Sequence, residues 1–244
     1  MSGVLRTISE RLSRDRVLKR RLPKEFNSRP LYVSPDAALR FWFNLASVDP
    51  ALFAIAREFV KSGDRVWDVG ANVGLFSFAA AALGGASGSV LAIEADPWLA
   101  GLLLKSASPF PNHAPVKVLP VAVSDRLELV DFNVAQRGRC TNFVSGFGAL
   151  QCNGSRLSFP QIAVSLDWLA DKFSPPSVLK IDVEGMEHIV LRGAANLLSH
   201  RPTIICEVQS ANHEEIVRTL TNCGYQIRKS GSSNNLVATH DNLQ

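Results

Sequence analysis

The sequence has few cysteines, no long apolar run and little net charge outside its N-terminus. Its four cysteines show no Cys-x-x-Cys spacing, so we expect reduced thiols rather than zinc ligands or a disulfide framework. No apolar run reaches the roughly 18 residues that span a bilayer. The compact apolar stretch of a secretory signal does not follow the basic N-terminus. These absences predict a cytoplasmic protein.

Charge of one sign is concentrated at the start of the chain. Residues 1–25 carry eight basic and three acidic side chains, while the whole chain has a net charge of +4, so the remainder is about neutral. A nucleic-acid-binding protein usually carries a basic patch on its folded body. We therefore expect no nucleic-acid partner.

Residues 1–22 show the spacing of an amphipathic helix, with Leu5, Ile8 and Leu12 on one face. Such a helix either packs on the domain with its arginines in solvent, or makes a peripheral contact with an anionic membrane or an acidic partner. Three prolines then break the helical pattern, which predicts a linker over residues 23–36.

Helical spacing resumes over residues 37–61, and the pattern indicates two helices. The second is expected to begin with Asp49 as its N-cap and Pro50 at its first helical position. We therefore predict an N-terminal helical extension over residues 1–60, followed by the main domain over residues 61–244.

Beyond residue 64, short apolar strands alternate with helical stretches. The expected strands are 65–69, 89–94, 116–121, 178–183, 203–208, 225–228 and 235–239. The expected helices are 74–84, 97–107, 165–172, 186–199 and 213–223. This alternation predicts an α/β three-layer sandwich around a mostly parallel seven-stranded sheet. The short spacing of the last two strands predicts a hairpin with one antiparallel edge strand.

The segment 131–160 has little regular pattern and contains four glycines. A structureless insertion of this length in a compact domain is usually functional. We expect it to cover the ligand crevice.

The first strand of the α/β region runs into the turn Asp68-Val-Gly-Ala-Asn-Val-Gly74. Gly70 and Gly74 are expected to permit a tight turn and a close ligand approach, with Asn72 between them. The helix that follows presents free N–H groups at the sheet edge where open α/β sheets bind ligands. Asp68 would attract a cationic amino group, which a dinucleotide lacks. A glycine-rich turn without a ligand is the alternative.

The spacing of this turn differs from the common phosphate-binding loops. The Gly-x-Gly-x-x-Gly pattern of dinucleotide-binding proteins is absent, and so is the Gly-Lys-Ser/Thr of a P-loop. Because both patterns are absent, we regard a dehydrogenase or a nucleoside triphosphatase as a weaker hypothesis.

Two further strand ends supply candidate cofactor contacts. Glu94 lies 20 residues beyond Gly74, a position suited to accepting hydrogen bonds from ribose hydroxyls, and Ala95 adjoins it. Asp96 is a better candidate than Glu94 to cap the helix that follows. After the third strand, Ser124 and Asp125 could reach an adenine amine or simply form a turn.

Several stretches together resemble the FkbM family of S-adenosylmethionine-dependent methyltransferases. They are Asp68–Ser77, Ala122–Asp125, Ser165–Asp167, Leu179–Glu187, Val190–Ala194 and Arg201–Glu207. The block Lys-Ile-Asp-Val-Glu-Gly within the fourth is the most specific, and the resemblance covers about residues 60–240. It implies a class I, Rossmann-like methyltransferase fold, S-adenosyl-L-methionine as cofactor and usually methylation of a hydroxyl oxygen. The chain departs from the family at Ala95, where the family typically has proline.

The fourth strand carries the candidate catalytic residues Lys180, Asp182 and Glu184. An alcohol acceptor must lose a proton, and clustered carboxylates raise one another's pKa until one can act as general base. Asp182 is the first choice, because the end of this strand normally abuts the methyl group in the fold that the resemblance implies. Lys180 would fix the cluster; alternatively, Lys180 and Glu207 form a structural ion pair. No metal requirement is expected.

The function that these features predict is O-methylation of a hydroxyl on a small molecule or a glycan. Two alternatives remain at this stage. One is a nicotinamide-dependent oxidoreductase, and the other is a non-catalytic scaffold that binds S-adenosylmethionine.

Overall fold

The computed structural model describes residues 12–136, 138–146, 154–230 and 235–240. A seven-stranded sheet forms its centre, in the order β12-β13-β11-β10-β3-β4-β5. The strands are β3 (Arg65–Val69), β4 (Ser89–Ile93), β5 (Val116–Leu119), β10 (Val178–Ile181), β11 (Thr203–Glu207), β12 (Gln226–Lys229) and β13 (Asn235–Thr239). Six of these strands run in the same direction, so the sheet is mostly parallel, as predicted. The antiparallel strand is β13, which lies one position in from the edge strand β12.

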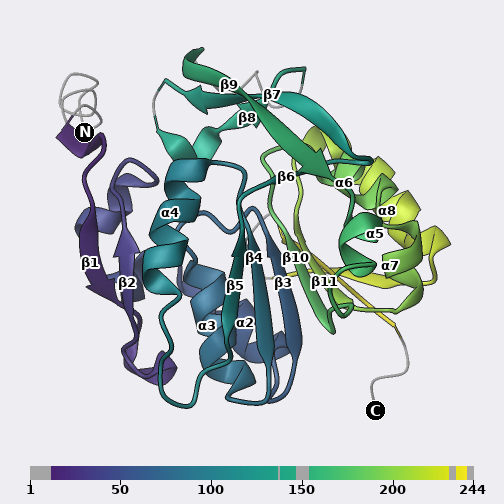
Figure 1. Cartoon of the computed structure of the whole chain (residues 1–244). Coiled ribbons are helices and arrows are strands. Elements are labelled where there is room, and N and C mark those ends of the chain that lie inside the picture. Colours follow the sequence, from purple (N-terminus) through teal and green to yellow (C-terminus); the bar gives the residue numbers. More distant parts are fainter. Residues whose placement is uncertain (1–11, 137, 147–153, 231–234, 241–244) are drawn as a thin grey trace.

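Helices cover both faces of this sheet (Figure 1). Helices α2 (Pro50–Phe59), α3 (Leu75–Gly84) and α4 (Pro97–Ser106) share one hydrophobic cluster with the strands. Helices α5 (Leu166–Ala170), α6 (Glu187–Arg192), α7 (Ala195–Ser199) and α8 (His213–Asn222) share a second. The central strands are buried on both faces, which explains their continuously apolar sequences. Among the described residues, none of the helices is long and apolar enough to cross a membrane.

The expected helix over residues 186–199 is divided in two. The break falls at Gly193, where a Cβ atom would lie 2.7 Å from the carbonyl oxygen of Ser124. Close backbone packing against the neighbouring strand end therefore sets this break.

The N-terminal region differs from its prediction. Strand β1 (Leu18–Arg21) pairs antiparallel with β2 (Pro30–Val33), and a 3-10 turn (Lys24–Phe26) joins them. The helix expected over residues 1–22 is therefore wrong at residues 18–21, and the expected linker contains a strand; residues 1–11 lie outside the described part. The spacing i, i+4 between Leu18 and Leu22 fits a strand as well as a helix, which misled the sequence interpretation.

Of the two helices predicted over residues 37–61, only the second is an α-helix. Two 3-10 helices, Leu39–Trp42 and Leu45–Ser47, occupy the place of the first. The second prediction is confirmed, because the Asp49 carboxylate accepts a hydrogen bond from the N–H of Leu52 at 2.9 Å and Pro50 begins α2. The cap fixes the direction of α2 beside the sheet edge where the site lies.

The insertion predicted to be irregular forms a small sheet instead. Strands β6 (Ala122–Val123), β7 (Glu128–Ala135), β8 (Phe143–Val144) and β9 (Ser155–Val164) lie in the order β6-β9-β7-β8. Figure 1 shows this sheet beyond the carboxyl ends of β3 and β4. The long strands leave one side in solvent, with Leu129 opposite Ile162 and both exposed. Their mixed polar and apolar sequence therefore hid the strand pattern.

The N-terminal hairpin is anchored to the domain by a buried arginine. Arg29 is 2% exposed and donates to the carbonyl oxygens of Ser106 and Ser108 at 3.0 and 2.9 Å. Its guanidinium carbon lies 4.6 Å from the ring centre of Phe78 on α3. These contacts tie the hairpin to α4 and α3 together.

Replacement of Arg29 by alanine should lower the free energy of unfolding by about 3 kcal/mol, because one buried and one partly buried carbonyl lose their donor and the packing on Phe78 is lost. Chemical denaturation measures this loss. Arg21→Ala is the matched control, since Arg21 lies exposed on the same hairpin and donates to the carbonyl of Ser28. It should change stability by less than about 0.5 kcal/mol. Equal effects of the two variants would contradict the anchoring role of Arg29.

Candidate active site

The turn between β3 and α3 lies at the carboxyl end of the sheet and is held by its own hydrogen bonds. The N–H groups of Gly70 and Ala71 donate to the carbonyl of Ile93 at 2.9 and 3.0 Å. Asn72 adopts a left-handed conformation with φ +52°, and its side-chain oxygen accepts from the N–H of Val73 at 2.8 Å. The turn therefore has a defined shape without a ligand.

The two glycines of this turn are required by protein packing, and their predicted contact with a ligand stays a prediction. At Gly70, with φ +77°, an added Cβ would lie 1.8 Å from the carbonyl oxygen of Asp182. At Gly74, with φ +89°, a Cβ would lie 2.6 Å from Leu103 and Phe78. Gly70 thus lets the ends of β3 and β10 come together, and Gly74 lets α3 pack on α4.

A cavity that we call the Glu94 cavity opens on one side of the turn. It encloses about 700 Å³ including its open mouth, a size suited to a small molecule. Its polar end contains Gly70, Asn72 and Glu94. Its other walls are mainly apolar, and include Ile93, Ala95, Leu99, Phe132, Val144 and Met186. A ligand with one hydroxylated and one flat apolar part matches this distribution.

Glu94 is held in place at the polar end of this cavity. It is 7% exposed and accepts hydrogen bonds from the N–H groups of Asn72 at 2.7 Å and Asp96 at 2.9 Å. Burial raises its pKa to about 7, although these two N–H groups oppose the shift. Asp96 caps α4 by accepting from the N–H of Trp98 at 2.9 Å, as predicted. The Glu94 carboxylate therefore has lone pairs left for a ligand.

A second cavity, which we call the Glu207 cavity, lies on the other side of the turn and encloses about 860 Å³ including open space. Side chains from the N-terminal segment form part of its wall, among them Arg40, Phe41 and Leu52. Its carboxylates are Asp49, Asp68, Asp182, Glu184 and Glu207. They outnumber the two cations in its lining, Arg40 and Lys180, so this cavity is acidic.

Lys180 balances part of this negative charge. Its Nζ lies 3.1 Å from Asp182 Oδ2 and 3.5 Å from Asp68 Oδ1. Burial favours its neutral form, but the two carboxylates outweigh burial and raise the pKa of Lys180, so it stays charged. Lys180 thus pairs with Asp182 and Asp68. The alternative expected from the sequence, an ion pair between Lys180 and Glu207, is not formed, and Glu207 is exposed at the end of β11.

Asp68 is engaged within the protein by one hydrogen bond and one ion pair, although its Oδ1 accepts no hydrogen bond from the described residues. It is fully buried, and its Oδ2 accepts a hydrogen bond from the Ser77 hydroxyl at 2.5 Å while Lys180 faces its other oxygen. The expected attraction of a cationic ligand group to Asp68 is therefore weakened, because Lys180 already matches its charge.

The chain after β10 makes a tight turn in which Glu184 and Gly185 both have positive φ, at +54° and +106°. Glu187 holds the turn by accepting hydrogen bonds from the N–H groups of Val183 at 3.1 Å and Gly185 at 3.0 Å. A left-handed glutamate is unfavourable by itself, by about 1 kcal/mol, and such strain is often found at functional sites. This turn places Asp182 and Glu184 where they line both cavities.

The carboxylates at this junction perturb one another. Burial and the nearby Asp182, Glu207 and Glu187 raise the pKa of Glu184 to about 8. Asp182, followed by burial, raises the pKa of Glu207 to about 7. Carboxyl groups that titrate near neutral pH are suited to proton transfer.

Two predicted cofactor residues do not line the Glu94 cavity. The Ser124 hydroxyl donates to Glu128 at 2.7 Å, and Asp125 forms ion pairs with Arg126 and Arg192 at 3.4 and 3.6 Å. Both lie in a neighbouring hollow beyond Val144 and Met186. Ala122 and Val123, just before them, line the cavity instead.

The insertion supplies site residues that no motif indicated. Phe132, Arg139, Asn142 and Phe143 line the Glu94 cavity, which confirms that this segment covers the crevice. Within the described ranges, no group of three or more His, Cys, Asp and Glu side chains has a metal-binding arrangement. Of the four cysteines, Cys206 is a buried free thiol and Cys223 an exposed one.

A parallel sheet with a glycine-bearing turn after β3, an acidic residue ending β4 and one antiparallel strand defines a class I methyltransferase fold. The family model described as Methyltransferase FkbM domain matches residues 68–227. The chain therefore belongs to the FkbM methyltransferase family, as its motifs predicted, and S-adenosylmethionine as cofactor agrees with this membership.

Solved structures show the same fold. The FkbM methyltransferase of Methylobacillus flagellatus is 13% identical, with a TM-score of 0.51 over 77% of this chain and 50% of that one. This chain thus corresponds to about half of that protein. The S-adenosylmethionine-dependent O-methyltransferase of Thermotoga maritima is also 13% identical, with a TM-score of 0.50 over 86% and 73% of the two chains. No curated protein matches the sequence significantly.

Replacement of Gly70 by alanine should destabilise the protein by at least about 2 kcal/mol, because the new methyl group would overlap the Asp182 carbonyl at a positive φ. Thermal unfolding measures the effect. Gly101→Ala is the control: Gly101 lies within α4, and no other atom lies within 4 Å of its added Cβ. That variant should be neutral or more stable by about 0.5 kcal/mol. A Gly70→Ala variant as stable as Gly101→Ala would refute the packing role of Gly70.

Proposed function

We propose that this protein transfers the methyl group of S-adenosylmethionine to a hydroxyl oxygen of a small molecule or a sugar. The observation that carries the proposal is the arrangement of the two cavities on either side of the Gly70 turn. They share Gly70, Asn72, Asp182 and Glu184 in their linings. A donor in one and an acceptor in the other would meet beside the two carboxylates.

The Glu94 cavity fits an adenosine-bearing cofactor. Glu94 has lone pairs free for ribose hydroxyls, and Ile93, Leu99, Phe132 and Met186 give an apolar surface for a base. Asn72 and Ala95 adjoin this polar end. S-adenosylmethionine, when bound, supplies a methyl group already activated as part of a sulfonium. The protein must therefore align the acceptor, exclude water and accept a proton.

The acidic Glu207 cavity selects among acceptors by charge. Desolvated carboxylates repel a phosphate or a phosphodiester, whereas carboxylates accept hydrogen bonds from hydroxyl groups. This charge favours a neutral hydroxylated acceptor over a nucleic acid. It also disfavours the nicotinamide alternative, since Asp182 and Glu184 lie beside the turn where a pyrophosphate would bind.

We assign the general base to Glu184 in preference to Asp182. The Asp182 carboxylate is already engaged in an ion pair and hydrogen bond with Lys180 at 3.1 Å, so it is less free to accept a proton from an acceptor. Within the described part of the chain, the Glu184 side chain forms no hydrogen bond or ion pair, and its pKa is raised to about 8. Lys180 and Asp182 then act by holding the end of β10 and the local charge in place.

We further propose that residues 61–244 form the methyltransferase domain and that residues 1–60 complete its acceptor site. Arg40, Phe41 and Asp49 support this division of roles, because they line the Glu207 cavity from outside the family match. A peripheral membrane or acidic-partner contact through residues 1–22 stays a prediction, and residues 1–11 lie outside the described part.

Calorimetric titration should show stoichiometric binding of S-adenosylmethionine and S-adenosylhomocysteine and no binding of NAD. Glu94→Ala should weaken S-adenosylhomocysteine binding by about tenfold or more, through loss of charged hydrogen bonds. Glu25→Ala, at an exposed ion pair with Arg57, is the control and should bind normally. Tight NAD binding without a response to S-adenosylmethionine would overturn the proposed function. Binding without methyl transfer to any of a panel of alcohols and sugars would favour the scaffold alternative.

Replacement of Glu184 by glutamine should lower kcat by about 10²-fold to 10⁴-fold, the usual contribution of a general base, and leave S-adenosylhomocysteine affinity within about threefold. In the wild-type enzyme the base must be ionised, so kcat should rise with pH and level off above about 8. Release of S-adenosylhomocysteine with an active acceptor measures both. If Glu184→Gln keeps this pH profile and full activity while Asp182→Asn loses both, the base is Asp182 instead.

A further inference from the structure

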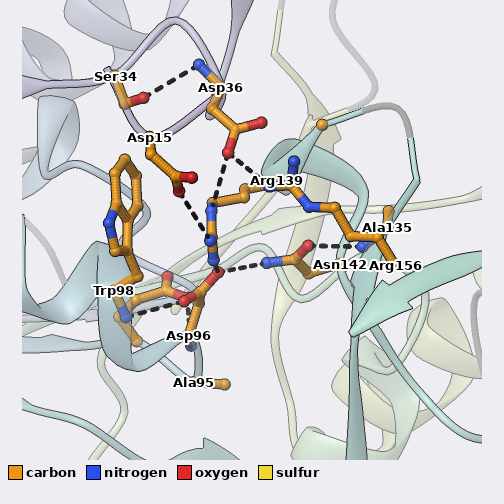
Figure 2. A network of polar contacts seen from close by, with 12 residues as sticks. Asp15, Ser34, Asp36, Ala95, Asp96, Trp98, Ala135, Arg139, Asn142 and Arg156 are labelled. Atoms are coloured by element: carbon orange, nitrogen blue, oxygen red, sulfur yellow. Dashed lines mark hydrogen bonds and ion pairs between the residues drawn. The ribbon is translucent and has the colours of Figure 1, made fainter. Parts of the chain in front are cut away.

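Arg139 joins three distant parts of the chain above the Glu94 cavity. It lies in a 3-10 turn (Arg139–Thr141) of the insertion, and only 9% of its side chain is exposed. Figure 2 shows its guanidinium between the carboxylates of Asp36 and Asp96. Its Nε donates to Asp36 at 3.0 Å, and a terminal N–H donates to Asp96. The guanidinium carbon also lies 4.5 Å from the ring centre of Trp98.

Further hydrogen bonds strengthen both ends of this bridge. The main-chain N–H of Arg139 donates to the carbonyl of Asp36 at 2.8 Å. The Asn142 side chain donates to Asp96 at 2.9 Å, and Arg156 donates to Asp36 (Figure 2). Two buried carboxylates are thus matched by two arginines. Loss of Arg139 would remove a cation from both buried carboxylates, whereas loss of Arg156 would leave both of them paired with Arg139.

The two carboxylates belong to elements that build different cavities. Asp96 follows Glu94 and Ala95, and it donates its N–H to Glu94. Asp36 precedes the segment whose Ala38, Arg40 and Phe41 line the Glu207 cavity. Arg139 itself, together with Asn142, lines the Glu94 cavity. The bridge therefore connects the cover of one cavity to the wall of the other.

We propose that Arg139 is a positioning residue for the methyl donor. By bridging Asp36 and Asp96 it holds residues 139–144 over the Glu94 cavity and couples this cover to the wall of the Glu207 cavity. The inference rests on the proposed function in one respect, that the Glu94 cavity binds the adenosyl group. A planar guanidinium donates from separate nitrogens of a rigid fork while its flat face stacks on an indole, and the single nitrogen of an ammonium group does not reproduce this geometry. We therefore expect that a lysine at position 139 does not restore the bridge between Asp36 and Asp96.

The decisive variant lies outside the lining of both cavities. Asp36 is 2% exposed and lines neither of them, so a loss of affinity in Asp36→Asn must act through its arginine partners. Arg156→Gln is the matched control, because Arg156 contacts the same carboxylate but does not line the Glu94 cavity. Arg228→Gln is a second control, at an exposed ion pair with Glu58.

Calorimetric titration of the full chain with S-adenosylhomocysteine tests the proposal. Arg139→Lys, Arg139→Gln and Asp36→Asn should each weaken binding by about tenfold, a usual size for coupling between sites. The double variant Asp36→Asn with Arg139→Gln should lose no more than the larger single loss, because both act through one contact. Both control variants should stay within about twofold of the wild type.

The outcomes separate this proposal from the proposed function. If the wild-type protein binds no S-adenosylhomocysteine, the function of the cavity is wrong, and the proposal falls with it. If the wild type binds and Arg139→Lys binds equally well, the positioning role is wrong while the function stands. If Arg139→Lys does not fold, Asp36→Asn decides alone. Additive losses in the double variant, or equal losses in Arg156→Gln, would also overturn the proposal.

Discussion

The site depends on the close approach of two strand ends, where the main chain of Gly70 passes the carbonyl of Asp182. A Cβ at Gly70 would lie 1.8 Å from that oxygen, so only glycine allows β3 and β10 to end side by side with this turn between them. The main-chain N–H of Asp182 donates to Val69 at 3.0 Å and fixes the register of the approach. The contact places the carboxylates after β10 where the two cavities meet.

Charge then determines how these carboxylates behave. One buried cation, Lys180, lies between Asp68 and Asp182 and forms an ion pair with each. Glu184 has no such partner within the described residues, and burial followed by its like-charged neighbours raises its pKa to about 8. A single lysine thus distinguishes two paired carboxylates from one carboxyl group whose pKa is raised. Two carboxylates two positions apart can differ in role for this reason.

The sequence predicted the parts of the fold that local patterns control. The buried parallel strands, the Asp49 cap and the family motifs were all readable, because each depends on residues close together in the chain. The hairpin at Leu18–Arg21 was not, since apolar residues four apart suit a helix and a strand equally. Ser124 and Asp125 were predicted, from their place after the third strand, to reach an adenine amine or to form a turn; they contact Glu128, Arg126 and Arg192 and do not line the Glu94 cavity.

The reason for Gly70 was also beyond local reasoning. Its position suggested a ligand contact, yet the constraint comes from Asp182, more than a hundred residues away. The same holds for Arg139, which no motif singles out and whose partner Asp36 lies 103 positions earlier in the sequence. Long-range contacts of this kind are visible only in the folded chain.

Some of these long-range contacts join residues inside the family match to residues that precede it, which limits how family members could vary the segment that precedes it. The family match begins at Asp68, so it contains the Gly70 turn, Glu94 and the carboxylates after β10. The segment with Asp36, Arg40 and Phe41 precedes it, yet forms the wall of the acidic cavity. Changes in that segment can therefore reshape the Glu207 cavity, where we propose that the acceptor binds, without disturbing the ends of β3 and β10. Any such change must still keep the contact between Asp36 and Arg139, because this arginine also lines the Glu94 cavity. This requirement limits how far the wall of the Glu207 cavity can shift.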